Sequence, residues 1–200
     1  MKFANKLFLT TTALLTLIFT LFGCWMLSSD FSALLDREIK RGNSESRMFR
    51  VLFEMGYQST QEYGEEYAIS RTLDSILDGV ERDGSHCFVL DDAAWVHGGE
   101  YLIEKGLQEE SETLREGLRG TRGSCYKVSR TEAGFFLINI SVAETETPVY
   151  LGMCRELTEI YQIRQNLVTQ YRTALSVLLA LGGVGIYILS RYITNPISSL

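Results

Sequence analysis

The side chains best suited to metal or acid–base chemistry in this sequence are two histidines and two cysteines in its middle part. His86 and His97 are the only histidines, and Cys87 and Cys125 lie in the same region. Imidazole nitrogens and thiolates bind zinc, but the spacing of these four residues matches none of the usual zinc patterns. Isolated histidines on strands are more often surface or hydrogen-bonded core residues, so we expect no metal site.

Paired carboxylates and nucleophiles are the other features that could support catalysis. The pairs Asp91-Asp92 and Glu109-Glu110 are typical of a solvated turn and of a solvated helix face. The sequence contains no glycine-rich phosphate-binding loop and no nucleophile with a credible base. We therefore predict no catalytic residue, no metal and no cofactor within these 200 residues.

A small-molecule pocket would need apolar walls and a few polar groups. We single out Trp95, His97 and Tyr126 as candidate ligand-binding residues. Aromatic side chains and a titratable group near the ends of strands are typical of pocket walls. The alternative, that these three are ordinary core or rim residues, stays open.

Two apolar segments determine where the rest of the chain can lie. Leu7–Leu27 contains no charge, and Ala174–Leu189 is apolar apart from Ser176. Leu7–Leu27 is long enough to cross a hydrocarbon core of about 30 Å, and Ala174–Leu189 is followed almost at once by the cation Arg191, as a membrane span with a cytoplasmic flank is. The short flanks carry Lys2, Lys6 and Arg191, and short basic flanks stay in the cytoplasm. We expect a cell-membrane protein with two spans, 7–27 and 172–190, cytoplasmic ends at 1–6 and 191–200, and an extracytoplasmic segment at 28–171.

A lipoprotein signal is a second interpretation of the first apolar segment. Leu21-Phe22-Gly23-Cys24 resembles a lipoprotein cleavage site. However, Phe22 is bulky where small residues are favoured, and Trp25-Met26-Leu27 continues the apolar run. The membrane span is therefore favoured.

Charge and cysteine content limit the partners of the segment between the spans. The net charge is −6, and all 25 acidic residues lie between Asp30 and Glu159. Such an acidic surface argues against nucleic acid and anionic membrane surfaces as partners. A single disulfide among Cys87, Cys125 and Cys154 is chemically permitted outside the membrane, and its pairing stays open.

The segment between the spans is predicted to be an α+β domain, helical over 28–80 and a sheet of about five antiparallel strands over 86–154. Apolar residues at 3–4 spacing predict a long helix with a possible kink at Gly42, and a second helix at Glu62–Val80. Alternation then predicts a hairpin around Asp91-Asp92, a helical stretch near Leu102–Leu118, and three strands. These strands are Cys125–Arg130, Gly134–Val142 and Val149–Cys154.

The same alternation predicts which side chains face the long helix. We expect eight apolar residues of the last three strands to share that face. They are Tyr126, Val128, Phe136, Ile138, Ile140, Val149, Leu151 and Met153.

The last part of the domain is predicted to be an exit helix over 155–171 that runs into the second span without Gly or Pro. Such a helix is a mechanical link, because motion at one end must reach the other. Its apolar repeat also predicts a seam for a parallel homodimer, which Arg164 interrupts. The repeat consists of Ile160, Ile163 or Arg164, Leu167, Tyr171 and Ala174.

Two short motifs carry a resemblance to a known family. Arg-x-Ile-Thr-x-Pro-Ile-x-x-Leu, from Arg191 to Leu200, looks like the opening of a HAMP linker. Val149–Tyr161 looks like the last strand and exit helix of sensor histidine kinases, where Arg155-Glu156-Leu157-Thr158 stands in place of Arg-Asp-Ile/Leu-Thr/Ser. With the two spans, the chain resembles the N-terminal sensor half of a bacterial transmembrane sensor histidine kinase with a PAS-like or single Cache domain.

The resemblance implies the following properties. An extracytoplasmic ligand or protein would be sensed, with small molecules binding on the sheet face away from the long helix. The signal would pass through Pro196 and Leu200 of a dimeric HAMP module to a kinase domain beyond this chain, which would bind ATP and phosphorylate a response regulator. A chemoreceptor, a diguanylate cyclase, or a membrane-anchored binding or adhesion module without cytoplasmic output are the alternatives.

Overall fold

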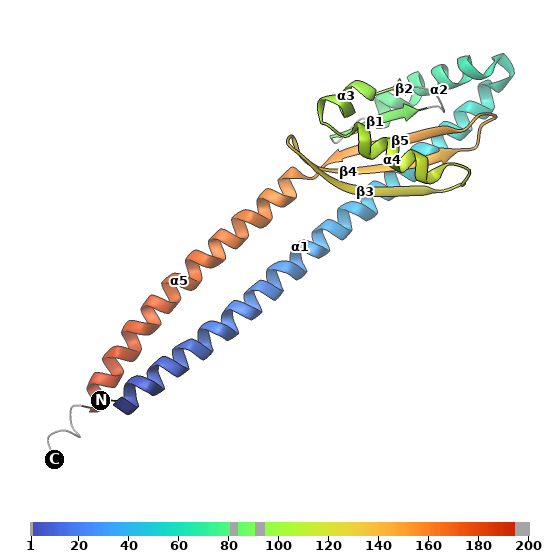
Figure 1. Ribbon diagram of the computed structural model, residues 1–200. Coiled ribbons are helices and arrows are strands. Elements are labelled where there is room, and N and C mark those ends of the chain that lie inside the picture. Colours follow the sequence, from blue (N-terminus) through green and yellow to red (C-terminus); the bar gives the residue numbers. More distant parts are fainter. Residues whose placement is uncertain (1, 81–83, 91–94, 195–200) are drawn as a thin grey trace. The chain divides into compact units, whose positions relative to one another are not determined.

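The computed structural model describes residues 2–80, 84–90 and 95–194 (Figure 1). The chain divides into two compact units, which are described separately. Leu35–Tyr161 form the sheet unit, and Met1–Leu34 together with Gln162–Leu200 form the helical unit. The predicted α+β class, the long N-terminal helix and the antiparallel sheet are confirmed.

The elements follow one another as helices first and strands later, with two short helices between the second and third strands. They are α1 (Lys2–Thr60), the 3-10 turn η1 (Gln61–Tyr63), α2 (Glu65–Val80), β1 (Ser85–Leu90), β2 (Trp95–His97), α3 (Gly99–Glu104), α4 (Gln108–Leu118), β3 (Ser124–Thr131), β4 (Gly134–Ala143), β5 (Val149–Glu156) and α5 (Thr158–Thr194).

The sheet has the strand order β2-β1-β5-β4-β3, and its paired strands are antiparallel. Four strands, β1, β5, β4 and β3, make most of it, and the three-residue β2 pairs with β1 at one edge. The turn predicted at Asp91-Asp92 lies outside the described residues. β5 is the last strand in the sequence and lies in the centre of the sheet, between β1 and β4. Every residue of β5 except Glu156 is buried.

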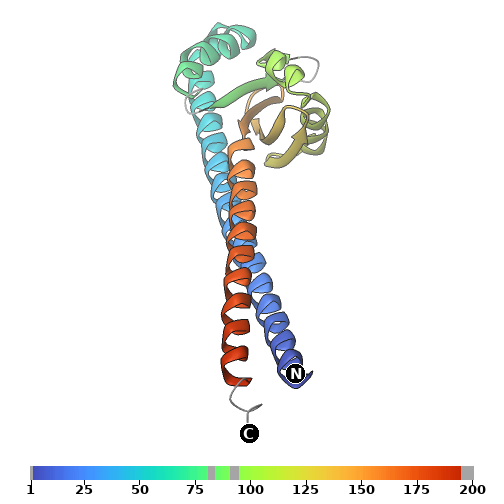
Figure 2. The same cartoon turned by 90° about the vertical axis from the view of Figure 1, so that its left-hand side faces the viewer.

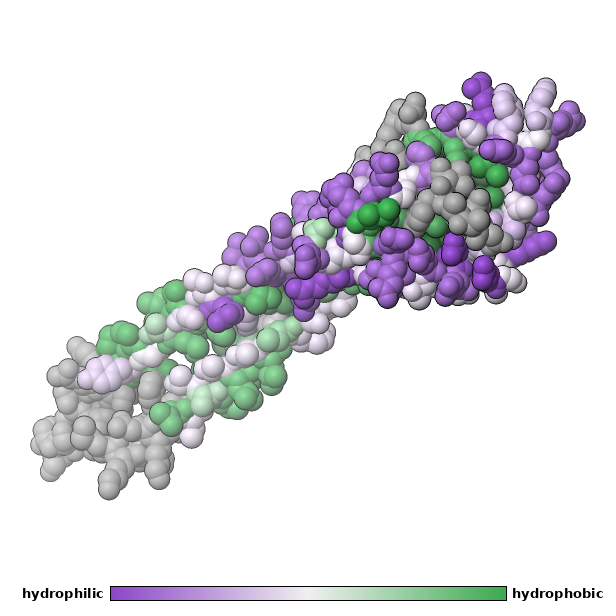
Figure 3. Space-filling model, turned by 45° about the horizontal axis from the view of Figure 1, so that its top comes forward, coloured by the Kyte–Doolittle hydropathy of each residue, from purple (hydrophilic) through white to green (hydrophobic). Residues whose placement is uncertain are grey.

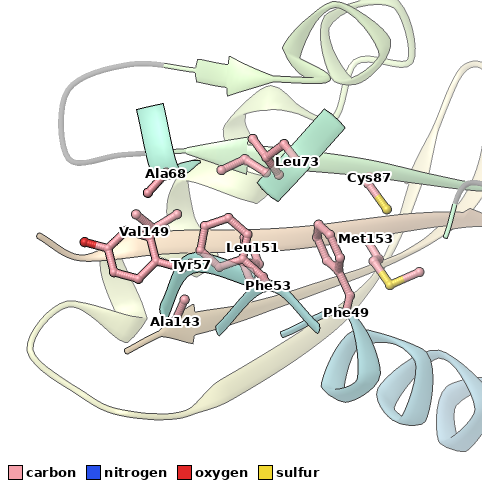
Figure 4. Packing of buried hydrophobic residues seen from close by; sticks show 11 residues of the cluster. Phe49, Phe53, Tyr57, Ala68, Leu73, Cys87, Ala143, Val149, Leu151 and Met153 are labelled. Carbon is pink, nitrogen blue, oxygen red and sulfur yellow. The ribbon is translucent and has the colours of Figure 1, made fainter. Parts of the chain in front are cut away.

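One face of the sheet packs against α1 and α2 (Figure 4). Phe49, Phe53 and Tyr57 follow one another at four-residue spacing on α1, which places them on one side of the helix. All three are almost completely buried. Burying such a side chain contributes roughly 1.5–3 kcal/mol relative to leaving it exposed. The cluster is completed by Ala68, Leu73, Cys87, Val89, Ala143, Val149, Leu151 and Met153.

The opposite face of the sheet is covered by α3 and α4. Leu102, Leu107 and Leu118 come from these helices and the loop between them. They pack against side chains of β1, β4 and β5, namely Phe88, Leu90, Phe136, Ile138, Ile140, Tyr150 and Cys154. The helical stretch predicted near Leu102–Leu118 is therefore two helices, and it closes the second face of the sheet.

The predicted face of three β4 residues is wrong. Phe136, Ile138 and Ile140 lie in the cluster under α3 and α4, not against α1. The register of β4 and β5 explains this, because Ile138 pairs with Cys154 while Asn139 pairs with Met153. Both faces of these strands are buried, including the polar Asn139 and Ser141 of β4, so alternation does not tell which helices cover which face.

α1 runs as one helix through Gly42, the position of the possible kink. Gly42 is buried. A Cβ atom there would lie 2.7 Å from Leu137 Cδ2 and 2.9 Å from Asn139 Nδ2. The glycine therefore lets the helix approach β4 closely, which a larger residue would prevent.

The cysteines of the sheet unit are separate from one another. Cys87, Cys125 and Cys154 form no disulfide, and neither does Cys24 of the helical unit. Cys87 belongs to the cluster under α1, whereas Cys154 belongs to the cluster under α3 and α4. The two lie on neighbouring strands but point to opposite faces, so they form no disulfide.

The helical unit contains the first part of α1 and most of α5, which run antiparallel side by side (Figures 1 and 2). Both helices are long and apolar enough to cross a membrane. Apolar side chains are exposed along them (Figure 3). The Tyr171 hydroxyl donates a hydrogen bond to the carbonyl of Phe19, and the Arg164 guanidinium lies 4.4 Å from the centre of the Phe31 ring. Arg164 and Tyr171 thus face α1 of the same chain.

Candidate functional site at the start of the exit helix

The structure does not bring the three predicted ligand-binding residues together. Trp95 and His97 lie on β2 and Tyr126 lies on β3, which are the two opposite edges of the sheet. His97 is half-buried, and Tyr126 is 49% exposed. The predicted signalling residues Pro196 and Leu200 lie outside the described residues.

A different set of residues converges where the sheet ends and the exit helix begins. Arg155 is the last buried residue of β5, and its side chain is only 9% exposed. Its Nη1 donates to Glu38 Oε2 at 3.3 Å and its Nη2 donates to Glu45 Oε2. Its Nε and Nη2 also donate to Ser85 Oγ, at 3.1 and 2.8 Å. We call Arg155, Glu38, Glu45 and Ser85 the junction cluster.

The junction cluster joins three elements that are distant in the sequence. Glu38 and Glu45 come from α1, Ser85 begins β1, and Arg155 is the second-last residue of β5. Glu45 also accepts a hydrogen bond from Arg41 Nε at 3.0 Å, so its carboxylate is shared by two arginines. A guanidinium removed from water needs such partners, because an unpaired buried charge costs several kcal/mol. The geometry therefore fixes the end of β5 against α1.

The first turn of α5 is fixed to the start of β4 by three contacts. The Leu157 amide donates to the Phe135 carbonyl at 2.7 Å, and the Phe135 amide donates to Thr158 Oγ1 at 3.1 Å. The Tyr161 ring stacks on the Phe135 ring, with centroids 3.6 Å apart and planes 3° from parallel. Leu157 itself is buried. The exit helix therefore begins from a defined position on the sheet.

Cys154 precedes Arg155 in β5, and its thiol is not a nucleophile. Burial raises the pKa of Cys154 to about 12, and the nearby Glu156 carboxylate acts in the same direction. Because the thiolate is the reactive form, this cysteine is inert near neutral pH. Among the described residues no group of His, Cys, Asp and Glu could hold a metal ion. The arrangement can therefore hold the end of β5 and the start of α5 in place and pass on a displacement between them. We assign it no catalytic chemistry.

Sequence reasoning found part of this site and missed its acidic half. Arg155, Leu157 and Thr158 belong to the motif that carried the family resemblance, and each makes one of the contacts above. Glu38 and Glu45 were missed. They are seven residues apart, which places them on one side of a helix, and this spacing was the available signal.

Comparison with known proteins adds no identification. No protein-family model matches the chain, and no curated protein is similar enough to match. A function for this chain therefore has to be argued from the geometry of its own residues.

Proposed function

We propose that this chain is the sensing and transmembrane signalling part of a bacterial sensor histidine kinase. The observation that carries the proposal is the junction cluster with its continuation into α5. Directly after Arg155 and Glu156, α5 begins at Thr158 and runs without a break for 37 residues to Thr194. A displacement of β5 relative to α1 would be passed along this helix, because α5 contains no Gly or Pro from Thr158 to Leu181 and a helix without such residues bends little.

The family-level parts of the proposal rest on the motifs in the sequence. The HAMP-like residues around Pro196 and Leu200 support a HAMP module that begins here. A kinase domain beyond this chain would bind ATP and use a response regulator as its partner. The PAS-like or Cache identity of the sheet unit is proposed on its α+β element order.

A parallel homodimer is part of the same proposal, and exposed apolar side chains support it. Ile163 and Leu167 are 42% and 41% exposed, and Met48, Val51 and Met55 form a second exposed apolar row on α1. These residues recur at spacings of three and four, as a helix–helix seam requires. Arg164, which interrupts the apolar repeat of this seam, lies over the ring of Phe31 of the same chain.

Changing the helical register of α5 tests the signalling mechanism. One residue inserted after Gln165 would rotate everything downstream by roughly 100° relative to the sheet unit. Autophosphorylation of the full-length protein in membranes should then become locked high or low. Seven inserted residues are the matched control and should restore near-normal output. Unchanged output after the one-residue insertion would contradict a continuous-helix mechanism.

The proposed topology can be tested separately, by cysteine labelling of intact cells with a membrane-impermeant reagent. Both termini should lie in the cytoplasm and the sheet unit outside. A cysteine introduced in place of Glu109 should be labelled, whereas cysteines in place of Lys2 and Asn195 should not. Labelling of either terminal position from outside would exclude this orientation.

A membrane-anchored binding or adhesion module remains the alternative of a different class. It would need the same sheet unit and the same anchors, but no change in cytoplasmic output. The coding sequence after Leu200 separates the two, since a stop codon there favours the module. A His-Glu-x-x-x-Pro helix with an ATP-binding domain favours the kinase, and a different output domain favours a chemoreceptor or a diguanylate cyclase.

A further inference from the structure

A polar cleft lies on the α1 side of the sheet, and of the three ligand-binding residues predicted from the sequence Tyr126 lines it. It has a volume of about 480 Å³, within the range of ligand sites. Asn43, Ser44, Arg47 and Arg50 of α1 form one wall. The other wall comes from the start of β3 and the end of β4, and it includes Ser124, Tyr126 and Ser141.

The charge of this cleft differs from that of the rest of the segment between the spans. Its lining contains two arginines and no acidic residue, although all 25 carboxylate side chains of the chain lie in the same segment. Arg47 and Arg50 are three residues apart, so both guanidinium groups leave the same side of α1. The cleft is therefore a local cationic site in an acidic surrounding.

Within the described residues, both guanidinium groups have N–H donors for which the protein supplies no close acceptor. Arg50 Nε is 3.8 Å from Glu54 Oε1, too far for a hydrogen bond, and this nitrogen is buried without an acceptor. Glu54 Oε1 already accepts a hydrogen bond from the Glu144 amide at 3.1 Å. Among the described parts of the chain, Arg47 takes part in no ion pair.

A second polar group in the same stretch is also unsatisfied. Asn139 pairs with Tyr126 in the register of β4 and β3, and it is only 3% exposed. Its side-chain carbonyl oxygen has no hydrogen-bond donor. A buried polar atom without a partner costs roughly 1–3 kcal/mol, and Asn139 lies opposite Tyr126, which lines the cleft.

We propose that this cleft binds a small molecule through a carboxylate or phosphate group, held by Arg47 and Arg50. An oxyanion supplies the acceptors that both guanidinium groups lack, in the paired geometry that arginine favours. The half-exposed ring of Tyr126 forms a wall against the rest of the ligand. Ser124 adds a hydroxyl. This site lies on the opposite sheet face from the one that the family resemblance implied.

The occupant would bridge α1 and β3, which makes the cleft a possible input for the signalling proposed above. The binding itself does not rest on that proposal. It is measured on the chain alone, without any cytoplasmic output, so a failure of binding and a failure of signalling are separate results.

Calorimetric titration of the full 200-residue chain in nanodiscs of neutral lipid tests the inference. Inorganic phosphate and succinate are the two probes, and the tighter of the two shows which head group the site prefers. We expect a dissociation constant of about 10–100 μM that weakens as salt is added. No heat from either probe at concentrations up to about 10 mM would overturn the proposal.

Variants show whether binding occurs in the cleft. Arg47→Gln and Arg50→Gln should each weaken binding by about 10-fold or more. The matched control is Arg115→Gln, which removes the same charge from α4, outside the cleft, and should leave binding unchanged. Equal weakening by all three variants would show that binding depends only on net charge, and it would overturn the proposal of a specific site. Far-ultraviolet circular dichroism of each variant shows whether it is folded.

Discussion

Two arginine sites on the α1 side of the sheet unit differ in whether their charges are paired. Arg155 is almost completely buried, and its guanidinium binds two carboxylates and a hydroxyl. Arg50 has a side chain that is 28% exposed, and its ion pair is long, while Arg47 is exposed. One site is closed by the chain itself and the other is open to a ligand.

The difference teaches how to separate a structural arginine from a binding one. Both kinds are cationic, and both lie where α1 meets the sheet, so charge and position do not distinguish them. What distinguishes them is the number of acceptors that the protein supplies. A charge removed from water must be paired within the protein, whereas a partly solvated charge is stable without a protein partner and stays available to a ligand.

The largest effect is expected from Arg155→Met, which keeps the apolar part of the side chain and removes its charge. Glu38 would then lose its arginine partner, and Glu45 would keep only Arg41. We expect a loss of roughly 2–3 kcal/mol in the free energy of unfolding. This is less than for a fully buried pair, because the two carboxylate side chains are 26% and 30% exposed.

Labelling of the buried Cys87 thiol at increasing urea concentrations, with the chain in nanodiscs, measures this loss. Arg155→Lys is the control, since it keeps the charge but not the fork of donors, and it should lose less stability. A change below about 0.5 kcal/mol for Arg155→Met would show that the junction cluster does not hold the sheet to α1.

At alkaline pH, the stability of the folded protein should depend on the buried thiol of Cys154, the residue before Arg155. The thiol of Cys154 has an ordinary pKa of 9.0, which burial raises to about 12 in the folded protein. Above pH 9 the unfolded chain therefore loses this proton while the folded chain keeps it. Stability should fall by up to about 1.4 kcal/mol per pH unit until about pH 12.

The measurement is the pH dependence of the unfolding free energy, with Cys154→Ala for comparison. This variant should be less stable at neutral pH but should show a shallower decline above pH 9. A decline of equal slope in both proteins would mean that Cys154 is not the group responsible. Burial also raises the pKa of Tyr101 to about 12, which adds to the decline above pH 10.

A smaller effect is expected from the ring pair that fixes α5. A double-mutant cycle with Phe135→Leu and Tyr161→Leu should give a coupling energy of about 1 kcal/mol, as stacked aromatic rings do. The cycle isolates the contact, because each leucine keeps part of the apolar area. A coupling energy near zero would leave the junction cluster as the main attachment of the exit helix.

The smallest effect is expected from Arg47→Met and Arg50→Met without ligand. Each should change the free energy of unfolding by less than about 0.5 kcal/mol, because the protein supplies neither guanidinium with a close ion pair. Unfolding in urea, as for Arg155→Met, provides the direct comparison. A loss as large as that of Arg155→Met would make these arginines structural and remove the contrast between the two sites.

The sequence by itself determined the elements of this protein and much of their order. Spacings of three and four residues predicted the long helices, and alternation predicted β3, β4 and β5 within a few residues of their observed ends. Two charge-free segments predicted the two helices that are apolar enough to span a membrane. These features are local, because they depend on residues within one or two turns or one strand of each other.

Only the tertiary structure decided which residues meet. It placed Tyr126 on the opposite edge of the sheet from His97, and it turned Ile138 toward α3 and α4. It also brought Glu38 to Arg155, which is 117 residues away. Strand order and register are set by packing both faces of the sheet at once, and the sequence of a strand that is buried on both faces does not show which helix covers which face.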